Sequence, residues 1–97
     1  VICLLKDHKT VITNGRETYI NTSGNAGMAT GGMGDVLAGV MGAILARTRE
    51  DDILYRAAVA AYLHGCAGDM AAEQKGRYSL MASDVINSLC EAIIKMQ

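Results

Sequence analysis

The sequence predicts a small α/β fold, because a β-rich segment is followed by three segments with helical periodicity. The β-rich segment opens with the apolar run VICLL. Two further β-type runs then flank Asn14-Gly15, and Asn-Gly is the strongest short-range signal for a hairpin turn. We therefore expect one strand, one β-hairpin and three helices.

The predicted strands are Val1–Leu5, Thr10–Thr13 and Glu17–Ile20, with the last two paired as the hairpin. The uninterrupted apolar character of Val1–Leu5 is typical of a central strand that is buried on both faces. Such a strand needs neighbours that 97 residues can hardly supply, so we expect this chain to be a piece of a larger fold.

The predicted helices cover Asp35–Arg47, Asp52 to about Gln74, and Ser83 to about Lys95. The first is apolar around most of its circumference, which predicts a buried helix. Glycine pairs in the first and second helices would allow another backbone to approach closely; these are Gly39 with Gly42 and Gly65 with Gly68.

The ends and the buried face of the last two helices can also be predicted. Gly76 is a suitable C-terminal residue for the second helix. Ser83 is a suitable N-cap for the third helix. The apolar face of that third helix is expected to comprise Val85, Leu89 and Ile93.

Composition limits the class of protein. Hydrophobic residues make up 51% of the 97 residues, enough for one small domain with a modest core. The net charge is −1 and no run of Lys or Arg exceeds two residues, which argues against nucleic-acid binding. The apolar stretches are too short to span a membrane. Three cysteines without CxxC spacing favour neither a disulfide framework nor a zinc site.

Two polar residues of the second helix are expected to have structural roles. His64 has no second metal-type ligand one turn away, so we expect a packed histidine and no metal site. Asp69 is expected to accept hydrogen bonds within the helix or from a loop.

The stretch GNAGMATGGMGDVLAG, from Gly24 to Gly39, carries the strongest chemical signal. Its glycines allow successive N–H groups to point the same way, and the helix that follows adds unpaired N–H groups and a positive dipole end. Gly32, Met33 and Gly34 could thus form an anion hole, with Asp35 beside it as a base for a substrate hydroxyl. The alternative is that Asp35 only caps its helix. Neither GxGxxG nor a Walker A motif is present.

This stretch resembles the signature of the NAD(P)H-hydrate dehydratases of the ribokinase-like superfamily, whose usual form is close to GNPGMATGGTGDVLAG. Three further segments are similar to that family in the same order: LLKDHKTVI, AYLHGCAGDMAAE and SLMASDVI. The resemblance implies that residues 1–97 are the C-terminal part of a single ribokinase-like domain.

The resemblance also implies residue roles. Asp35 would be the catalytic base and contact the substrate, Gly32, Met33 and Gly34 would form the anion hole, and Gly34 would also touch the nucleotide. The other nucleotide-binding residues would be Lys6, Asp7, His8, Lys9 and Thr10. The chain departs from the family pattern at Asp7, usually glycine, at Ala26, usually proline, and at Met33, usually threonine.

The implied reaction phosphorylates the C6 hydroxyl of hydrated NADH or NADPH with ADP or ATP and Mg²⁺, and loss of phosphate regenerates the reduced cofactor. The resemblance implies a cytoplasmic enzyme, and unpaired strand edges favour a homo-oligomer. Two alternatives stay open. One is a sugar or vitamin-precursor kinase of the same fold, and the other is an inactive fragment or nucleotide-binding module.

Overall fold

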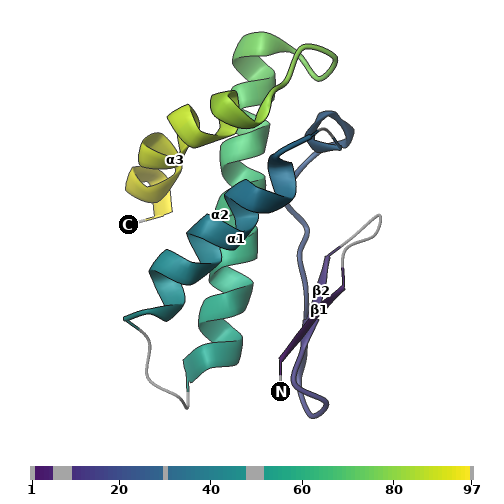
Figure 1. The fold of residues 1–97 in the computed structure, drawn as a ribbon, viewed down its shortest axis with the longest axis vertical. Coiled ribbons are helices and arrows are strands. Elements are labelled where there is room, and N and C mark those ends of the chain that lie inside the picture. Colours follow the sequence, from purple (N-terminus) through teal and green to yellow (C-terminus); the bar gives the residue numbers. More distant parts are fainter. Residues whose placement is uncertain (1, 6–9, 30, 48–51, 97) are drawn as a thin grey trace.

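The computed structural model describes residues 2–5, 10–29, 31–47 and 52–96, and within these it confirms the predicted α/β architecture. The chain forms a three-stranded sheet, a single turn of 3-10 helix and three α-helices (Figure 1). In chain order they are β1 (Cys3–Leu5), β2 (Val11–Thr13), β3 (Thr18–Ile20), η1 (Ala26–Met28), α1 (Met33–Leu45), α2 (Ile53–Lys75) and α3 (Ala82–Met96).

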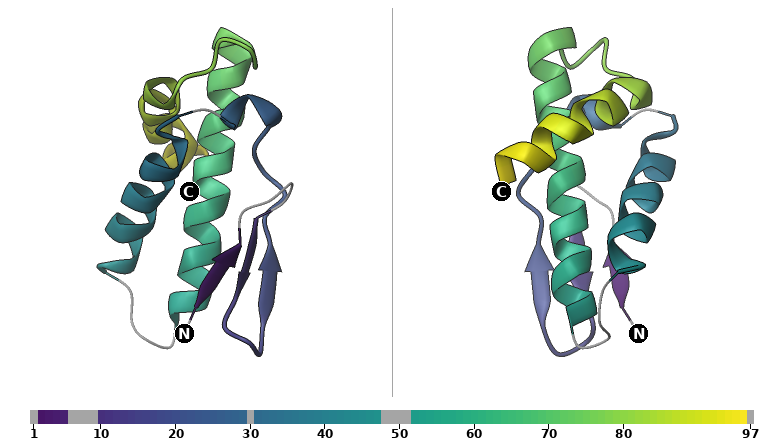
Figure 2. Two further views of the ribbon diagram at one scale, coloured as in Figure 1. Left: turned by 45° about the vertical axis from the view of Figure 1, so that its right-hand side comes forward. Right: turned by 90° about the vertical axis from the view of Figure 1, so that its left-hand side faces the viewer.

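The elements form three layers. Figure 2 shows α1 and α2 side by side over one face of the sheet, with α3 crossing on their far side. Between the sheet and the helices lies a core cluster of Ile12, Leu37, Leu54, Ala57 and Ala61. A second cluster joins the three helices and consists of Met33, Leu63, Ala67, Ala71, Leu80, Val85 and Ala92.

The sheet is antiparallel throughout, in the order β1-β2-β3. The hairpin predicted at Asn14-Gly15 is confirmed, and it joins β2 to β3. Asn14 Oδ1 accepts hydrogen bonds from the N–H groups of Arg16 and Glu17, both at 2.9 Å, while Gly15 takes a φ of 92°. The two residues therefore serve different purposes in the turn: asparagine supplies a side-chain acceptor, and glycine adopts the left-handed backbone conformation.

The expectation that the first strand is buried on both faces is wrong for this structure. Among the described residues β1 is an edge strand that pairs with β2 alone, and Cys3 and Leu5 are exposed while Leu4 is half-buried. With α1 and α2 on one side of the sheet, only one face of β1 is covered by the described residues.

Helix α1 is less buried than its composition predicts. Only Met33 and Leu37 are buried, because the sheet and α2 cover a single side of the helix. The expected close approach at Gly39 and Gly42 is also absent: among the described atoms, a Cβ at either position would meet nothing within 4 Å. The same expectation for Gly65 and Gly68 is confirmed, since a Cβ there would overlap Ser23 and Met28 respectively.

Helix α3 begins one residue before the predicted cap. It starts at Ala82, and the Asp84 carboxylate accepts a hydrogen bond from the Met81 N–H at 2.9 Å, so Asp84 and not Ser83 caps the helix. Its buried face contains Val85 as predicted, but Ser88 and Ala92 are the other buried residues, and Ile93 is 44% exposed.

Helix α2 ends as predicted, with Gly76 at a φ of 79° and its N–H bonded to the Ala72 carbonyl at 2.8 Å. Over the residues that the structure describes, none of the helices is long and apolar enough to cross a membrane.

Candidate functional site

The glycine-rich loop is fastened along α2 by polar side chains at its start. Asn21 Nδ2 donates a hydrogen bond to the Ala61 carbonyl at 3.2 Å, and Ser23 Oγ donates to the Tyr62 carbonyl at 2.9 Å. Gly65 permits this contact, because any side chain there would overlap Ser23. The loop therefore leaves β3 and runs directly against the α2 backbone.

Asp69 holds the next part of the loop, as its predicted hydrogen-bonding role requires. Its Oδ2 accepts from the Gly24 N–H at 3.0 Å, and its Oδ1 accepts from Asn25 Nδ2 at 2.9 Å. Asn25 in turn uses its own Oδ1 to accept from the Gly27 N–H at 3.0 Å, which caps η1. One carboxylate on α2 thus fixes both the loop backbone and the cap of η1.

The single turn η1 is held on two sides. The Met28 side chain lies against Gly68 of α2. On the other side, a Cβ on Gly27 would come within 2.9 Å of the Arg77 Cα, so this backbone packs against the segment that follows α2. Met28 also packs on the helical cluster that contains Met33, which links η1 to the first residue of α1.

The predicted anion hole lies at the N-terminus of α1. Gly32 is the N-cap residue and has a φ of 85°, a conformation that favours glycine. The N–H groups of Met33, Gly34 and Asp35 belong to the first turn and have no carbonyl partner within the helix. Met33 as a whole residue is only 3% exposed, whereas Gly32 and Gly34 are exposed. The exposed part of the predicted anion hole is therefore formed by the two glycines.

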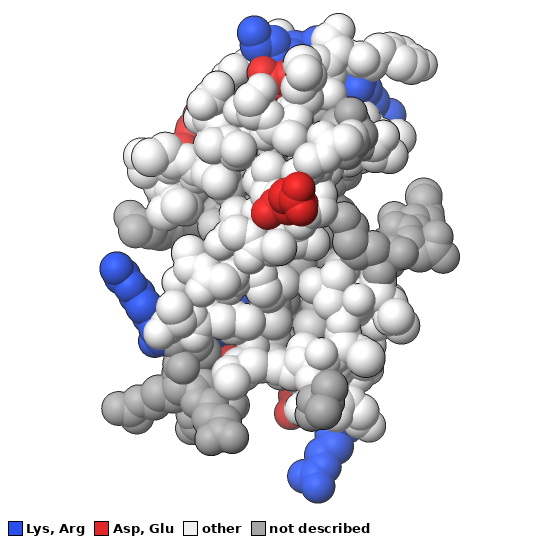
Figure 3. Space-filling model, viewed as in Figure 1, with Lys and Arg blue, Asp and Glu red and all other residues white. Residues whose placement is uncertain are grey.

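Asp35 is the third residue of α1 and is exposed, so three of the four residues Gly32–Asp35 are accessible at this turn, and Met33 is buried beneath them. Figure 3 shows an acidic group near the middle of this face, over the start of α1 and surrounded by uncharged atoms. A carboxylate at this position can accept a proton from a hydroxyl bound beside it.

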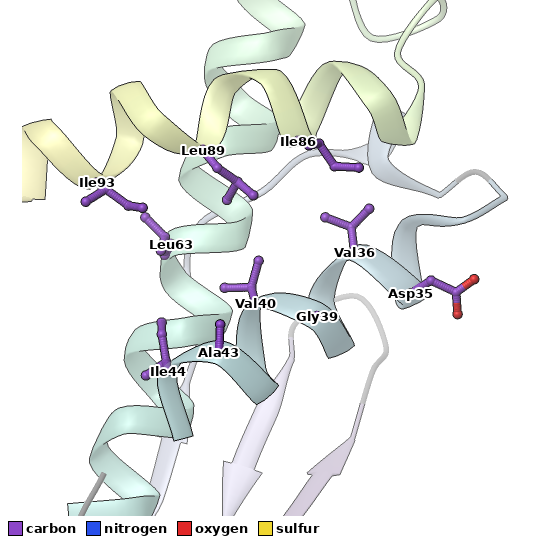
Figure 4. A pocket seen from close by; sticks show the side chains of 10 residues that line it. All are labelled: Asp35, Val36, Gly39, Val40, Ala43, Ile44, Leu63, Ile86, Leu89 and Ile93. Carbon is purple, nitrogen blue, oxygen red and sulfur yellow. The ribbon is translucent and has the colours of Figure 1, made fainter. Parts of the chain in front are cut away.

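An apolar groove of about 490 Å³ runs between α1 and α3, with Asp35 at one end. Figure 4 shows Val36 and Val40 of α1 facing Ile86 and Leu89 of α3, while the Asp35 carboxylate points away from the groove. The Asp35 carboxylate is therefore accessible from outside the groove.

The predicted nucleotide segment is only partly placed. Lys6, Asp7, His8 and Lys9 lie outside the described residues. Thr10 is half-buried, and its carbonyl accepts from the Asn21 N–H at 2.8 Å, which ties the start of the hairpin to the start of the glycine-rich loop.

The described residues contain no group of three His, Cys, Asp or Glu side chains able to hold a metal ion. His64 is buried in α2, as expected for a packed histidine. On α2, a hydrogen bond with the Cys66 side chain raises the pKa of Tyr62.

The loop anchors were not foreseen from the sequence. Every second position from 21 to 25 carries a short polar side chain, namely Asn21, Ser23 and Asn25. Side chains of this kind often form hydrogen bonds with neighbouring backbone groups. Their partners lie about forty residues away on α2, as the hydrogen bonds of Asn21 and Asn25 show. The signal in the sequence is the spacing of Gly65, Gly68 and Asp69, which indicates a face of the second helix that another segment can approach closely.

Comparison with known proteins decides the family. The family described as NAD(P)H-hydrate dehydratase matches residues 1–91. The chain belongs to the NAD(P)H-hydrate dehydratase family. It is 45% identical over 94 residues to the bifunctional NAD(P)H-hydrate repair enzyme Nnr of Archaeoglobus fulgidus, which covers 97% of this chain and 19% of that protein.

Two ADP-dependent (S)-NAD(P)H-hydrate dehydratases are also similar. The protein from Neisseria meningitidis serogroup B is 45% identical over 74 residues, covering 75% of this chain and 24% of that protein. The protein from Cenarchaeum symbiosum is 42% identical over 93 residues, covering 96% of this chain and 30% of that protein.

Among solved structures, Bacillus subtilis YxkO, a member of the UPF0031 family, matches 99% of this chain and 35% of its own with a TM-score of 0.89 and 25% identity. SMU.573 from Streptococcus mutans matches 98% of this chain and 33% of its own, with a TM-score of 0.85 and 28% identity. The chain thus spans between about a fifth and a third of the length of these relatives.

Proposed function

We propose that this family member is the C-terminal part of a single ribokinase-like domain, and that the whole protein carries out nucleotide-dependent dehydration of hydrated NADH or NADPH. Family membership supports the reaction class. The observation that carries the proposal is an exposed carboxylate, Asp35, in the first turn of α1 beside the exposed glycines Gly32 and Gly34.

In the proposed reaction, Asp35 accepts the proton of the C6 hydroxyl while the hydroxyl oxygen forms a bond to the terminal phosphorus of the nucleotide. The bond from that phosphorus to the bridging oxygen breaks at the same time, and the shortened nucleotide, AMP when ADP is the donor, leaves with the bonding electrons. The first-turn N–H groups hold the negative charge on the transferred phosphoryl group. The C6–O bond then breaks and phosphate leaves with the bonding electrons. The neighbouring C5 loses a proton to solvent, and the electrons of that C–H bond form the C5=C6 double bond of the reduced nicotinamide. Asp35 also orients the substrate, because proton transfer requires the hydroxyl within hydrogen-bond distance.

We propose ADP as the phosphoryl donor, because two of the relatives are named as ADP-dependent enzymes. Gly34 would touch the nucleotide, together with Thr10 and Lys6–Lys9. The exposed Gly34 and the first-turn N–H groups suit an anionic ligand. Mg²⁺ usually binds through nucleotide phosphates and one or two carboxylates, and the described residues offer no fuller cage for it.

The deciding experiment uses the whole protein with hydrated NADH and either ADP or ATP, and follows recovery of the near-ultraviolet absorbance of reduced nicotinamide. We expect recovery that depends on the nucleotide, with ADP as the better donor. Absence of recovery with both nucleotides would exclude the proposal. A stable phosphorylated product from a sugar or vitamin precursor would favour a kinase of the same fold.

We also propose that the protein is cytoplasmic and self-associates. Both edges of the sheet are open to pairing within the described residues, and Leu5 on β1 and Ile20 on β3 are exposed. Light scattering of the whole protein would measure its mass, and a monomeric mass at working concentration would rule out self-association.

A further inference from the structure

We infer that Asp69 is a positioning residue of the proposed reaction, and that its carboxylate sets where the anion hole and Asp35 lie. This inference rests on the proposed function. Asp69 is on α2 and does not belong to the glycine-rich loop. Its two carboxylate oxygens reach that loop at Gly24 and at Asn25, at 3.0 and 2.9 Å.

A series of contacts connects the Asp69 carboxylate to the first turn of α1. Asn25, held by Asp69, caps η1 through the Gly27 N–H. η1 is wedged between Gly68 of α2 and Arg77. Its Met28 shares a core cluster with Met33, the first residue of α1.

The start of α1 has a fixed neighbour as well. A Cβ on Gly32 would lie 3.3 Å from Ala82 Cβ, so the N-cap residue rests on the first residue of α3. The loop is thus held at one end by α2 and at the other by α3. A change at the Asp69 end should alter the direction in which the first-turn N–H groups point.

The pattern of donors and acceptors makes this inference testable. Gly24 and Asn25 both donate to Asp69, so Asp69 must present two acceptors. In Asp69→Asn one acceptor becomes an NH₂ group, which faces a donor. Rotating the Asn25 amide to compensate would turn its NH₂ group toward the Gly27 N–H and break the cap of η1. The single variant therefore cannot satisfy every group.

Asn25→Asp fails for the opposite reason, because two carboxylates would then face each other. The double variant Asn25→Asp/Asp69→Asn restores the pattern. The new amide at 69 accepts from the Gly24 N–H and donates to the carboxylate at 25, whose other oxygen still accepts from the Gly27 N–H. A role that depends on these hydrogen bonds is therefore rescued by exchanging the two side chains.

The experiment measures kcat, KM and thermal unfolding of the whole protein for the wild type, both single variants, the double variant, and Glu73→Gln as control. Glu73 is an exposed acid one turn further along α2. We expect each single variant to lower kcat by about 100-fold, the scale expected for a displacement of about 1 Å at a reacting group. The double variant should recover most of that loss, and the control should match the wild type.

Several outcomes would overturn the inference. One is a single variant that unfolds at a lower temperature yet keeps the wild-type kcat, since Asp69 would then only stabilise the fold. Another is a double variant no faster than the single variants.

Hydrogen exchange separates this inference from the proposed function. The Val36 amide, which donates to the Gly32 carbonyl at 3.1 Å, should exchange faster in each single variant and return to the wild-type rate in the double variant. Inactivity of the wild type toward hydrated NADH would reject the proposed function, while the exchange rates would still decide whether Asp69 orders the start of α1. Unchanged exchange of the Val36 amide would overturn the inference whatever the activity.

Discussion

Asp35 and Asp84 occupy the same position in their helices but have different surroundings. Each is the third residue of a helix, α1 and α3 respectively, where a negative charge is stabilised by the helix dipole. The Asp84 carboxylate bonds back to the Met81 N–H, whereas Asp35 is exposed beside two accessible glycines. The position in the helix is thus the same, and only the neighbours distinguish a capping acid from a candidate base.

The first prediction uses this pair. Asp35→Asn should lower kcat by about 100-fold or more, because the general base is lost. Asp84→Asn should leave kcat unchanged. Each substitution removes a comparable charge–dipole interaction of about 0.3–1 kcal/mol, so the free energies of unfolding should fall by similar small amounts. Steady-state kinetics and denaturant unfolding of the whole protein measure both quantities. Equal kcat values for the two variants would reject Asp35 as the base.

Met33 leads to a second prediction at this scale. Its side chain is buried in the helical cluster, so Met33→Ala should destabilise the protein by about 2–5 kcal/mol through the cavity it leaves. Met33→Leu conserves volume and should cost less than about 1.5 kcal/mol. Both variants keep the backbone N–H, so kcat per folded molecule should stay near the wild-type value. A large loss of kcat in Met33→Leu at unchanged stability would mean that the side chain itself takes part.

At the scale of elements, the sequence predicts turns and helix ends better than it predicts which elements pack against one another. The Asn14-Gly15 hairpin and the end of α2 at Gly76 depend on nearby backbone groups, and both are confirmed. The predicted burial of β1 and α1 is wrong for this structure. An apolar side chain is suited to burial, but the pattern does not show whether this chain supplies the element that would cover it. The anion-hole residues were predictable as a group, since they are contiguous, while the clamp from Asp69 joins residues more than forty positions apart.

Glycines in different settings give the third prediction. Alanine at Gly65 would meet the Ser23 backbone carbon at 2.7 Å, so the loop must move. Alanine at Gly68 meets only the Met28 side chain, which can adjust. Alanine at Gly42 meets nothing within 4 Å in the described residues and should stabilise α1 by up to about 1 kcal/mol. The midpoints of denaturant unfolding should therefore rank Gly42→Ala first, Gly68→Ala next and Gly65→Ala last.

The control for that ranking is activity. Gly65→Ala is expected to lower kcat more than Gly68→Ala, because it displaces the backbone of the loop that leads to α1, whereas Gly68→Ala displaces only the Met28 side chain. If Gly65→Ala unfolded like the wild type, the direct contact between the loop and α2 would not exist in solution.

At the scale of the whole molecule, several large apolar side chains are exposed, and some of them gather on α3. Ile86, Ile93 and Ile94 on α3 are 54%, 44% and 68% exposed, and two of them line the groove beside α1. The chain corresponds to 35% of the YxkO structure, which it matches closely. Surface of this kind commonly marks an interface with another part of a protein.

The last prediction follows from that surface. Residues 1–97 alone should bind a hydrophobic dye and self-associate, and they should show no turnover of hydrated NADH with ADP, because much of a substrate pocket would have to come from the rest of the proposed domain. The association should persist at high salt, since screening weakens charge pairs but not apolar contacts. Light scattering at low and high salt, beside the absorbance assay, tests both parts. Turnover by the isolated chain would show that Asp35 and its loop suffice for catalysis, and a monomeric chain without dye binding would show that the groove closes on itself.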